Sequence, residues 1–160
     1  MASKGNNTLT KGIPPTEDAF VVLVKTEWNT HLVNTLEKGA RDIFKTAGTK
    51  VKTLTVPGAV ELCFAVKQHY AYAPKTPDAY IVLGTVIQGD TPHFDYVCQA
   101  VTEGVTQLNL QLDVPVIFGV LTVLNETQAK ERLGGAHGHK GQEAAITALK
   151  MIHLNRSLQS

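Results

Sequence analysis

Residues 19–24 read Ala-Phe-Val-Val-Leu-Val (AFVVLV), a continuous apolar run in which three of the six residues are β-branched. This length and composition are typical of a strand that is buried on both faces of a sheet. Two later runs have the same character, Ala79–Leu83 (AYIVL) and Val114–Val120 (VPVIFGV), and Val51–Val56 is also rich in β-forming residues. The sequence therefore predicts four strands.

Helical patterns separate these strands. After the first strand, apolar residues recur every three or four positions and Gly48 is expected to end the helix; the apolar positions are Leu32, Val33, Leu36, Ala40, Ile43, Phe44 and Ala47. Further helices are expected over Ala59–Tyr72, from Pro92 onward, over Glu126–Leu133 and over Gln142–Arg156. The apolar face of the helix after Pro92 would hold Phe94, Val97, Cys98, Val101, Val105 and Leu108.

Strands that alternate with helices predict right-handed crossovers and a parallel sheet with both faces covered. We expect an α/β fold, a flavodoxin-like three-layer αβα sandwich with a four-stranded parallel sheet in the order 2-1-3-4. Residues 1–18 are expected to form a flexible N-terminal tail and residues 19–160 a single domain.

Composition excludes several classes of protein. The net charge of +1 gives no bulk electrostatic attraction to nucleic acid or to a membrane surface, and no apolar stretch is long enough to cross a bilayer. The N-terminus has no apolar run behind its early lysine, so no signal peptide is expected. Cys63 and Cys98 fall in apolar helical patterns, which predicts reduced thiols in a cytoplasmic protein.

Ligands of such sheets bind beyond the carboxyl ends of the strands. Trp28 and Asn29 follow the first strand, where the indole could cover the core or stack on a planar heterocycle. After the second strand, Gly58 would let a ligand approach the backbone. Glu61 would either complement the start of the next helix or accept hydrogen bonds from ligand hydroxyls.

The loop after the third strand carries the strongest signal. We expect the strand to stop at Gly84, and the loop then runs through Gly89 into a helix start, an arrangement that offers amides and a positive dipole end to a phosphate. Asp90 and Thr91 could simply cap that helix. His93, in the first turn, is either a surface residue or a general acid and base.

Two candidates lie near the C-terminus. Arg132 is either a solvated helix charge or a bidentate phosphate ligand. His137 and His139 lack carboxylates or thiols at metal-ligand spacing, so no metal site is expected. From these residues alone we expect an α/β domain that binds a phosphorylated small molecule, and the reaction stays open.

Five segments in order resemble the lumazine synthase family. They are Trp28-Asn29, Val56–Leu62 (VPGAVEL), Gly84–Asp95 (GTVIQGDTPHFD), Val114–Thr122 (VPVIFGVLT) and a C-terminal set with Gln128-Ala129, Glu131-Arg132 and Gly141. Each motif alone is weak, but five at the right spacing are specific, and the resemblance covers about Ala19 to His153.

The resemblance implies that 5-amino-6-ribitylaminouracil condenses with 3,4-dihydroxy-2-butanone 4-phosphate to form 6,7-dimethyl-8-ribityllumazine, phosphate and water. It implies that Trp28 stacks on the pyrimidine ring and that Val86 and Ile87 bind its edge. The ribityl chain would be held by Asn29, the backbone around Ala59-Val60, and Glu61. No metal or organic cofactor is expected, because holding two reactants together supplies much of the rate.

The phosphate would be bound by Gly89, Asp90 and Thr91, and by Arg132 of the adjacent subunit. Phe118 of that neighbour would cover the ring, and His93 would move protons during the reaction. The resemblance thus implies a homopentamer with sites between subunits. It leaves open a 60-subunit icosahedral shell and a partnership with riboflavin synthase.

Three departures from the family pattern weaken the expected phosphate site or its surroundings. Lys25-Thr26-Glu27 replaces a run of small residues and arginine, Gln88 stands where arginine or lysine is common, and Ala136 stands where many members carry lysine. Two competing functions follow, a non-catalytic flavin- or lumazine-binding pentamer or shell, and a monomeric flavodoxin-like mononucleotide binder.

Overall fold

The computed structural model describes residues 12–160. Eleven of the residues expected to form the N-terminal tail lie outside this range. One parallel sheet contains β1 (Phe20–Thr26), β2 (Lys50–Val56), β3 (Ala79–Ile87) and β4 (Val116–Val123). Its order is β2-β1-β3-β4, which confirms the expected topology.

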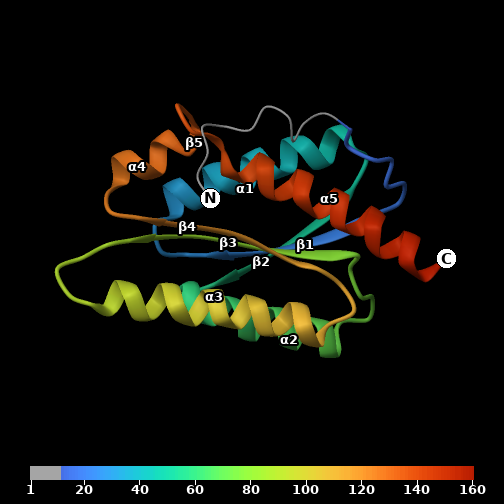
Figure 1. Cartoon of the computed structure of the whole chain (residues 1–160), viewed down its shortest axis with the longest axis horizontal. Helices are drawn as coiled ribbons and strands as arrows, with labels where there is room; N and C mark the ends of the chain where they lie inside the picture. Colours follow the sequence, from blue (N-terminus) through green and yellow to red (C-terminus); the bar gives the residue numbers. More distant parts are fainter. Residues whose placement is uncertain (1–11) are drawn as a thin grey trace.

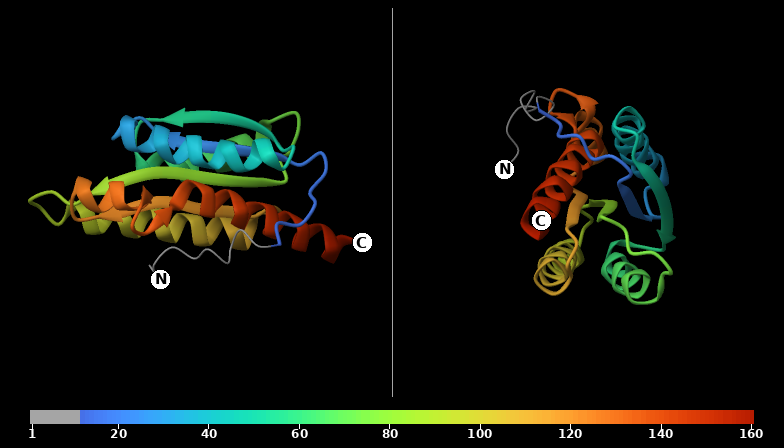
Figure 2. Two further views of the ribbon diagram at one scale, coloured as in Figure 1. Left: turned by 90° about the horizontal axis from the view of Figure 1, so that it is seen from above. Right: turned by 90° about the vertical axis from the view of Figure 1, so that its right-hand side faces the viewer.

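Helices cover both faces of this sheet, as the end-on view in Figure 2 shows. One layer holds α1 (Thr30–Thr46) and α5 (Lys140–Gln159), and the other holds α2 (Leu62–Tyr72) and α3 (His93–Gln111) (Figure 1). The sheet therefore has two separate cores. One includes Leu36, Phe44 and Leu149, and the other includes Val66, Val82 and Val105. The expected three-layer αβα sandwich is confirmed.

The helix ends follow local sequence. Gly48 has a φ of 69°, so it takes the left-handed conformation that commonly ends a helix just after α1. The segment before α2 is a short 3-10 turn, η1 (Ala59–Glu61), rather than the start of a continuous helix. On α3, Val101, Val105 and Leu108 are buried as expected, whereas Phe94, Val97 and Cys98 are only half-buried.

The boundaries of β3 and β4 differ most from the prediction, since β3 ends at Ile87 and β4 runs from Val116 to Val123. β3 continues through Gly84 to Ile87, because Gly84 pairs with Val120 and lies closely against Thr26, where a Cβ atom would be 3.3 Å from the threonine Cγ2. β4 begins at Val116 because Asn109 both donates to the Val116 carbonyl and accepts from its amide, at 2.8 and 2.9 Å.

The C-terminal region also differs from expectation. The short helix α4 (Glu126–Glu131) ends two residues earlier than expected, and a hairpin of β5 (Leu133–Gly135) and β6 (Gly138–His139), for which no strands were predicted, lies between it and α5. α5 is longer than expected at both ends. Among the helices of residues 12–160, none is long and apolar enough to cross a membrane.

Candidate functional site

The carboxyl ends of β1, β2 and β3 bring three loops together at one end of the sheet. The amide of Glu27 donates to the Val56 carbonyl at 2.8 Å, which joins the first loop to the second. The Asn29 side-chain amide donates to the Thr85 carbonyl at 2.8 Å, which joins the first loop to β3. The three loops therefore form a single surface at the point where the chain order of the strands reverses.

Trp28 stands out from this surface. Its side chain is 73% exposed, so the indole does not cover a core. Its backbone is held on both sides, since its amide donates to the Pro57 carbonyl and its carbonyl accepts from the Thr26 hydroxyl, each at 3.2 Å. A fixed backbone with an exposed ring gives a platform on which a flat ligand can stack.

Gly58 lies between Trp28 and Glu61. A Cβ atom at Gly58 would be 3.1 Å from Glu61 Oε2 and 3.6 Å from Trp28 Cδ1. The Gly58 amide donates to Glu61 Oε2 at 2.9 Å, so this oxygen caps the turn. The second oxygen of Glu61 has no hydrogen-bond partner among residues 12–160 and lies in an exposed side chain, so both roles considered for Glu61 are compatible with the structure.

The residues before α3 offer unpaired donors. Within the described chain, the amides of Gly89, Asp90 and Thr91 donate to no backbone or side-chain acceptor, and all three residues are exposed. The Thr91 hydroxyl accepts from the His93 amide at 3.4 Å, a weak capping contact. His93 is exposed in the first turn of the 19-residue helix α3. This loop matches the expected anion site in form.

Val86 and Ile87 pack on different faces of the sheet. Val86 contacts the core beneath α2 and α3, whereas Ile87 contacts the core beneath α1 and α5. The two side chains therefore diverge at the end of β3. Ala59 is half-buried and Val60 is exposed in η1, beside Gly58.

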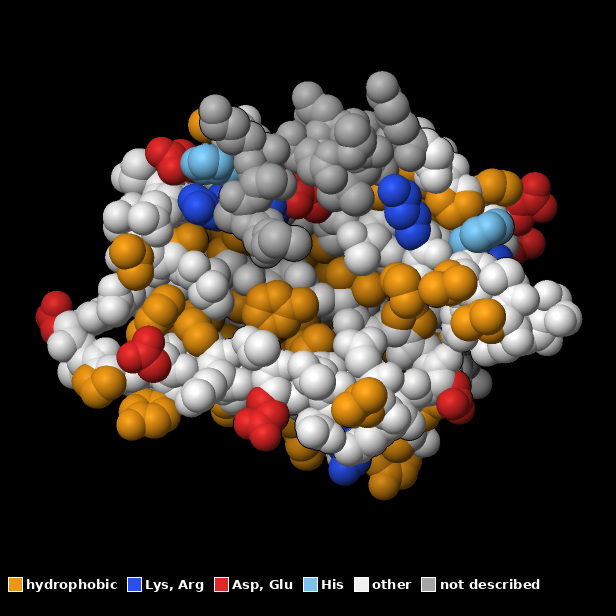
Figure 3. Space-filling view, in the orientation of Figure 1, with side chains coloured by type: hydrophobic (Ala, Val, Ile, Leu, Met, Phe, Trp, Pro, Cys, Tyr) orange, Lys and Arg blue, Asp and Glu red, His pale blue; other side chains and the backbone are white. Residues whose placement is uncertain are grey.

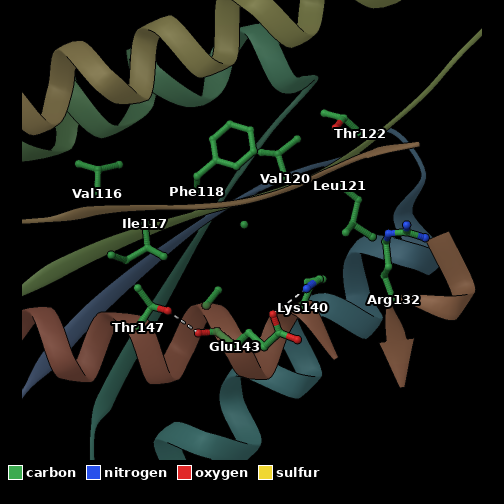
Figure 4. Close-up of a pocket in the computed structure, with 12 residues that line it drawn as sticks. Val116, Ile117, Phe118, Val120, Leu121, Thr122, Arg132, Lys140, Glu143 and Thr147 are labelled. Carbon is green, nitrogen blue, oxygen red and sulfur yellow. Dashed lines mark hydrogen bonds and ion pairs between the residues drawn. The ribbon is translucent and has the colours of Figure 1, made fainter. Parts of the chain in front are cut away.

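The remaining candidates lie along the free edge of the sheet. A groove of about 640 Å³ follows β4 and is bounded by Phe118, Arg132 and Lys140. Figure 4 shows Phe118 on one side of β4 together with Val116 and Val120, and the charged residues on the other side. Phe118 is 40% exposed although it lies in the middle of a strand. An exposed aromatic ring on an edge strand is typical of a contact surface.

Two cations reach this groove. The Arg132 side chain is 22% exposed, and its Nη1 donates to the Gln128 carbonyl at 2.9 Å, which leaves its other donors for a ligand. Lys140 Nζ lies 2.7 Å from Glu143 Oε2, as the dashed line in Figure 4 marks. The Lys140 amide donates to the Arg132 carbonyl at 2.9 Å, because the hairpin between them folds the chain back. Lys140 was missed in the sequence, although a second cation eight positions after Arg132 was a usable signal.

His139 has a structural role and His137 lies near it. His139 Nδ1 accepts from the Gln142 amide at the start of α5, and the ring lies so close to Gly39 of α1 that a Cβ atom there would clash. Burial lowers the pKa of His139, so this ring stays neutral. Residues 12–160 contain no group of three or more His, Cys, Asp or Glu side chains placed to hold a metal ion.

One chain does not bring all the candidates together. The residues around Trp28 line a hollow of their own with Asn29, and the groove along β4 contains neither these residues nor His93. The candidates thus form two sets: a strand-end set, made of Trp28, Asn29, Gly58–Glu61 and Val86–His93, and an edge set, made of Phe118, Arg132 and Lys140.

The family model for 6,7-dimethyl-8-ribityllumazine synthase matches residues 18–156. The chain belongs to the 6,7-dimethyl-8-ribityllumazine synthase family. A protein of that name from Porphyromonas gingivalis is 46% identical over 149 residues, which cover 91% of this chain and 91% of its own. One from Bacteroides fragilis is 47% identical over 139 residues, which cover 85% of this chain and 96% of its own. One from Corynebacterium kroppenstedtii is 41% identical over 162 residues and covers 100% of this chain and 98% of its own.

Both sets of candidates fall inside the matched region of the lumazine synthase family. The match starts just before β1 and ends within α5. The resemblance of the five segments is therefore confirmed at the level of the family.

Proposed function

We propose that this chain is a 6,7-dimethyl-8-ribityllumazine synthase. It condenses 5-amino-6-ribitylaminouracil with 3,4-dihydroxy-2-butanone 4-phosphate and releases phosphate and water. Membership of the family supports the reaction, since the relatives reported above carry that name. The structural observation that carries the proposal is the row of three unpaired amides at Gly89–Thr91, directly before α3 and beside His93.

The uracil substrate occupies the surface around Trp28. Its ring stacks on the exposed indole, and backbone groups of Val86 and Ile87 meet the ring edge. The ribityl hydroxyls reach the free oxygen of Glu61 and the backbone of Ala59-Val60 in η1, and the side-chain oxygen of Asn29 accepts a further bond. Gly58 leaves room for this chain, because it has no Cβ atom between Trp28 and Glu61.

The phosphate of the second substrate binds at the start of α3. The amides of Gly89, Asp90 and Thr91 and the positive end of the helix dipole stabilise its charge. Gln88 and Ala136 provide no positive charge here, so Arg132 becomes the main cation for this anion.

His93 moves the protons of the reaction. It lies in the first turn of α3, one residue after Pro92, so its imidazole is within reach of a substrate whose phosphate sits on the preceding amides. We propose that it transfers protons during imine formation, phosphate elimination and ring closure. Positioning of the two substrates supplies the rest of the rate, and the scheme requires no metal or organic cofactor.

The complete site forms between two copies of the chain. The edge set of one copy supplies Arg132 and Phe118 to the strand-end set of its neighbour, with Lys140 beside them. Exposed apolar side chains support this contact surface: Phe118 lies on β4, and Met151, Leu154 and Leu158 lie on α5. Figure 3 shows hydrophobic side chains gathered across this side of the molecule. Exposed apolar residues at a free sheet edge favour burial against another subunit.

We propose that the assembly is a homopentamer, since the family resemblance implies a ring of five. A native mass measurement tests this directly: five chains of 17.3 kDa support the pentamer, sixty support a shell, and one contradicts both. The enzymatic claim is tested by incubating the purified protein with both substrates and recording the fluorescence of the lumazine product. No product at high protein concentration would defeat the claim.

A further inference from the structure

A basic pocket lies at the opposite end of the sheet from the strand-end set. The amino-terminal ends of β1 and β2 and the carboxyl end of α2 enclose about 270 Å³. In Figure 1 the loop before α3 marks the strand ends at one side of the molecule, and the C-terminus marks the other side. Four basic residues line this pocket, and no carboxylate does: Lys50, Lys52, Lys75 and His69. We call these residues the basic pocket.

The fold explains why three lysines converge here. Lys50 and Lys52 occupy alternate positions of β2, so their side chains leave the same face of the strand. Leu54 continues that face and packs against the core beneath α2. Lys75 follows α2 and places its Nζ 5.5 Å from the centre of the Phe20 ring, and Phe20 pairs with Lys50 in the sheet.

These three exposed ammonium groups have no carboxylate partner in the part of the chain that the structure describes. Among residues 12–160, none of the three lysines lies within ion-pair distance of a carboxylate. Asp78 accepts from the Phe20 amide at 2.8 Å, but its other oxygen is held by Arg156 at 2.9 Å. The carboxyl end of α2 contributes roughly half a negative charge, which three positive charges exceed several-fold.

His69 organises one side of the basic pocket. Its Nδ1 lies 2.8 Å from the hydroxyl of buried Tyr80, and its Nε2 lies 3.3 Å from Lys52 Nζ. Burial, and then the charge of Lys52, lower the pKa of His69, which favours the neutral ring that can accept from the lysine. Lys52 is thereby held in place with two further N–H donors directed elsewhere.

We propose that the basic pocket binds the phosphate group of a small phosphorylated molecule. Ammonium groups bind phosphate as compact point charges, and three of them surround a hollow that contains no competing carboxylate. The volume lies just below the usual range for pockets of organic ligands, which suits a phosphate with a small substituent. This site is separate from the anion site at Gly89–Thr91.

Equilibrium dialysis of the intact protein with radiolabelled inorganic phosphate at low ionic strength tests the proposal. The double variant Lys52→Met/Lys75→Met keeps much of the aliphatic stems and removes two charges. Its control is Lys67→Met, an exposed lysine of α2 outside the pocket. A second variant, Lys52→Arg/Lys75→Arg, keeps the charge, and circular dichroism checks that each variant folds.

If the basic pocket binds phosphate, Lys52→Met/Lys75→Met should lose one phosphate equivalent per chain, or bind it on the order of tenfold more weakly. The control Lys67→Met and the charge-retaining variant Lys52→Arg/Lys75→Arg should keep it. If the enzymatic proposal also holds, wild type binds about two equivalents and the variant about one. If only the basic pocket binds phosphate, wild type binds about one equivalent per chain and the methionine double variant binds none. Equal binding by wild type and the double variant overturns the proposal, whatever the state of the active site.

Discussion

The side-chain amide of Asn29 donates a hydrogen bond of 2.8 Å to the carbonyl oxygen of Thr85. This bond ties the residue after Trp28 to the segment of β3 that leads into the proposed phosphate-binding loop. Asn29 also has a φ of 57°, a left-handed conformation that asparagine tolerates better than most residues, and its carbonyl accepts the first hydrogen bonds of α1. Asn29 therefore holds the loop after β1 against β3, and with it the two proposed substrate surfaces.

Asn29→Ala is expected to lower the free energy of unfolding by about 1–3 kcal/mol, because it strains the left-handed backbone and leaves the Thr85 carbonyl without its donor. Asn29→Gly, which relieves only the strain, should lose about 1 kcal/mol less. Urea titrations of the three proteins check this order. A glycine variant less stable than the alanine variant would contradict the assigned backbone role.

Arg132→Ala is expected to raise KM for the butanone phosphate on the order of tenfold to a hundredfold, since one charged hydrogen-bond donor to phosphate is lost. KM for the uracil substrate should change much less. Arg132→Lys restores the charge but not the planar donor set, so it should recover only part of the affinity. Steady-state kinetics with each substrate varied in turn gives both values, and equal effects on both substrates would refute the role.

His93→Ala is expected to slow turnover by about a hundredfold or less, the usual contribution of one positioned acid-base group when water can substitute in part. Both KM values should stay close to those of wild type, because His93 is not assigned to substrate affinity. Measurement of kcat at saturating concentrations of both substrates tests this. A wild-type kcat in the variant would remove His93 from the mechanism.

The lowered pKa of Glu37 predicts that the free energy of unfolding depends on pH. Burial opposes its ionisation, but hydrogen bonds from Lys25, Thr53 and Arg41 outweigh burial and lower its pKa to about 2. A carboxylate whose pKa is lowered in the folded state stabilises the fold above its unfolded pKa, here 4.5, and this contribution is lost as the pH falls towards 2. The side chain is only 13% exposed, so the contribution at pH 7 is roughly 2–3 kcal/mol.

Glu37→Gln should therefore be less stable than wild type at pH 7 and approach wild-type stability near pH 2. Asp42→Asn removes an acid from an exposed pair with Lys38 and is expected to change stability by less than about 1 kcal/mol. Urea unfolding at pH 7, 4.5 and 3 measures the difference. A constant gap between wild type and Glu37→Gln at all three pH values would show that Glu37 acts through packing instead.

The order of the sheet could be predicted because four apolar runs alternate with helical patterns, and right-handed crossovers leave few arrangements. The end of β3 could not be predicted, because a glycine such as Gly84 commonly ends a strand, whereas here it lies within the sheet against Thr26. The hairpin at Leu133–His139 also escaped prediction, since its strands are two or three residues long and contain three glycines. Short, glycine-rich pairs carry no usable periodicity.

The form of the candidate site was predictable where it depends on local sequence and not where it depends on distant contacts. The unpaired amides at Gly89–Thr91 follow from a glycine-bearing loop before a helix, which the sequence displays. The departure at Lys25-Thr26-Glu27 was expected to weaken the phosphate site or its surroundings, and the structure shows that Lys25 forms an ion pair within one chain, with Nζ 2.6 Å from Glu37 Oε2. Lys140 was missed because its place beside Arg132 depends on the hairpin, which the sequence did not predict.

The claim that the site is shared between two copies has a direct test in mixed oligomers. His93→Ala chains and Arg132→Ala chains are unfolded together, refolded as a mixture and assayed at a low concentration of the butanone phosphate, where each variant alone is nearly inactive. If His93 of one copy and Arg132 of its neighbour serve the same site, about a quarter of the sites in a random equimolar mixture are complete, and activity rises well above both parents. If the activity of the mixture equals the average of the two variants, the two residues do not meet across a subunit contact and the shared site is contradicted.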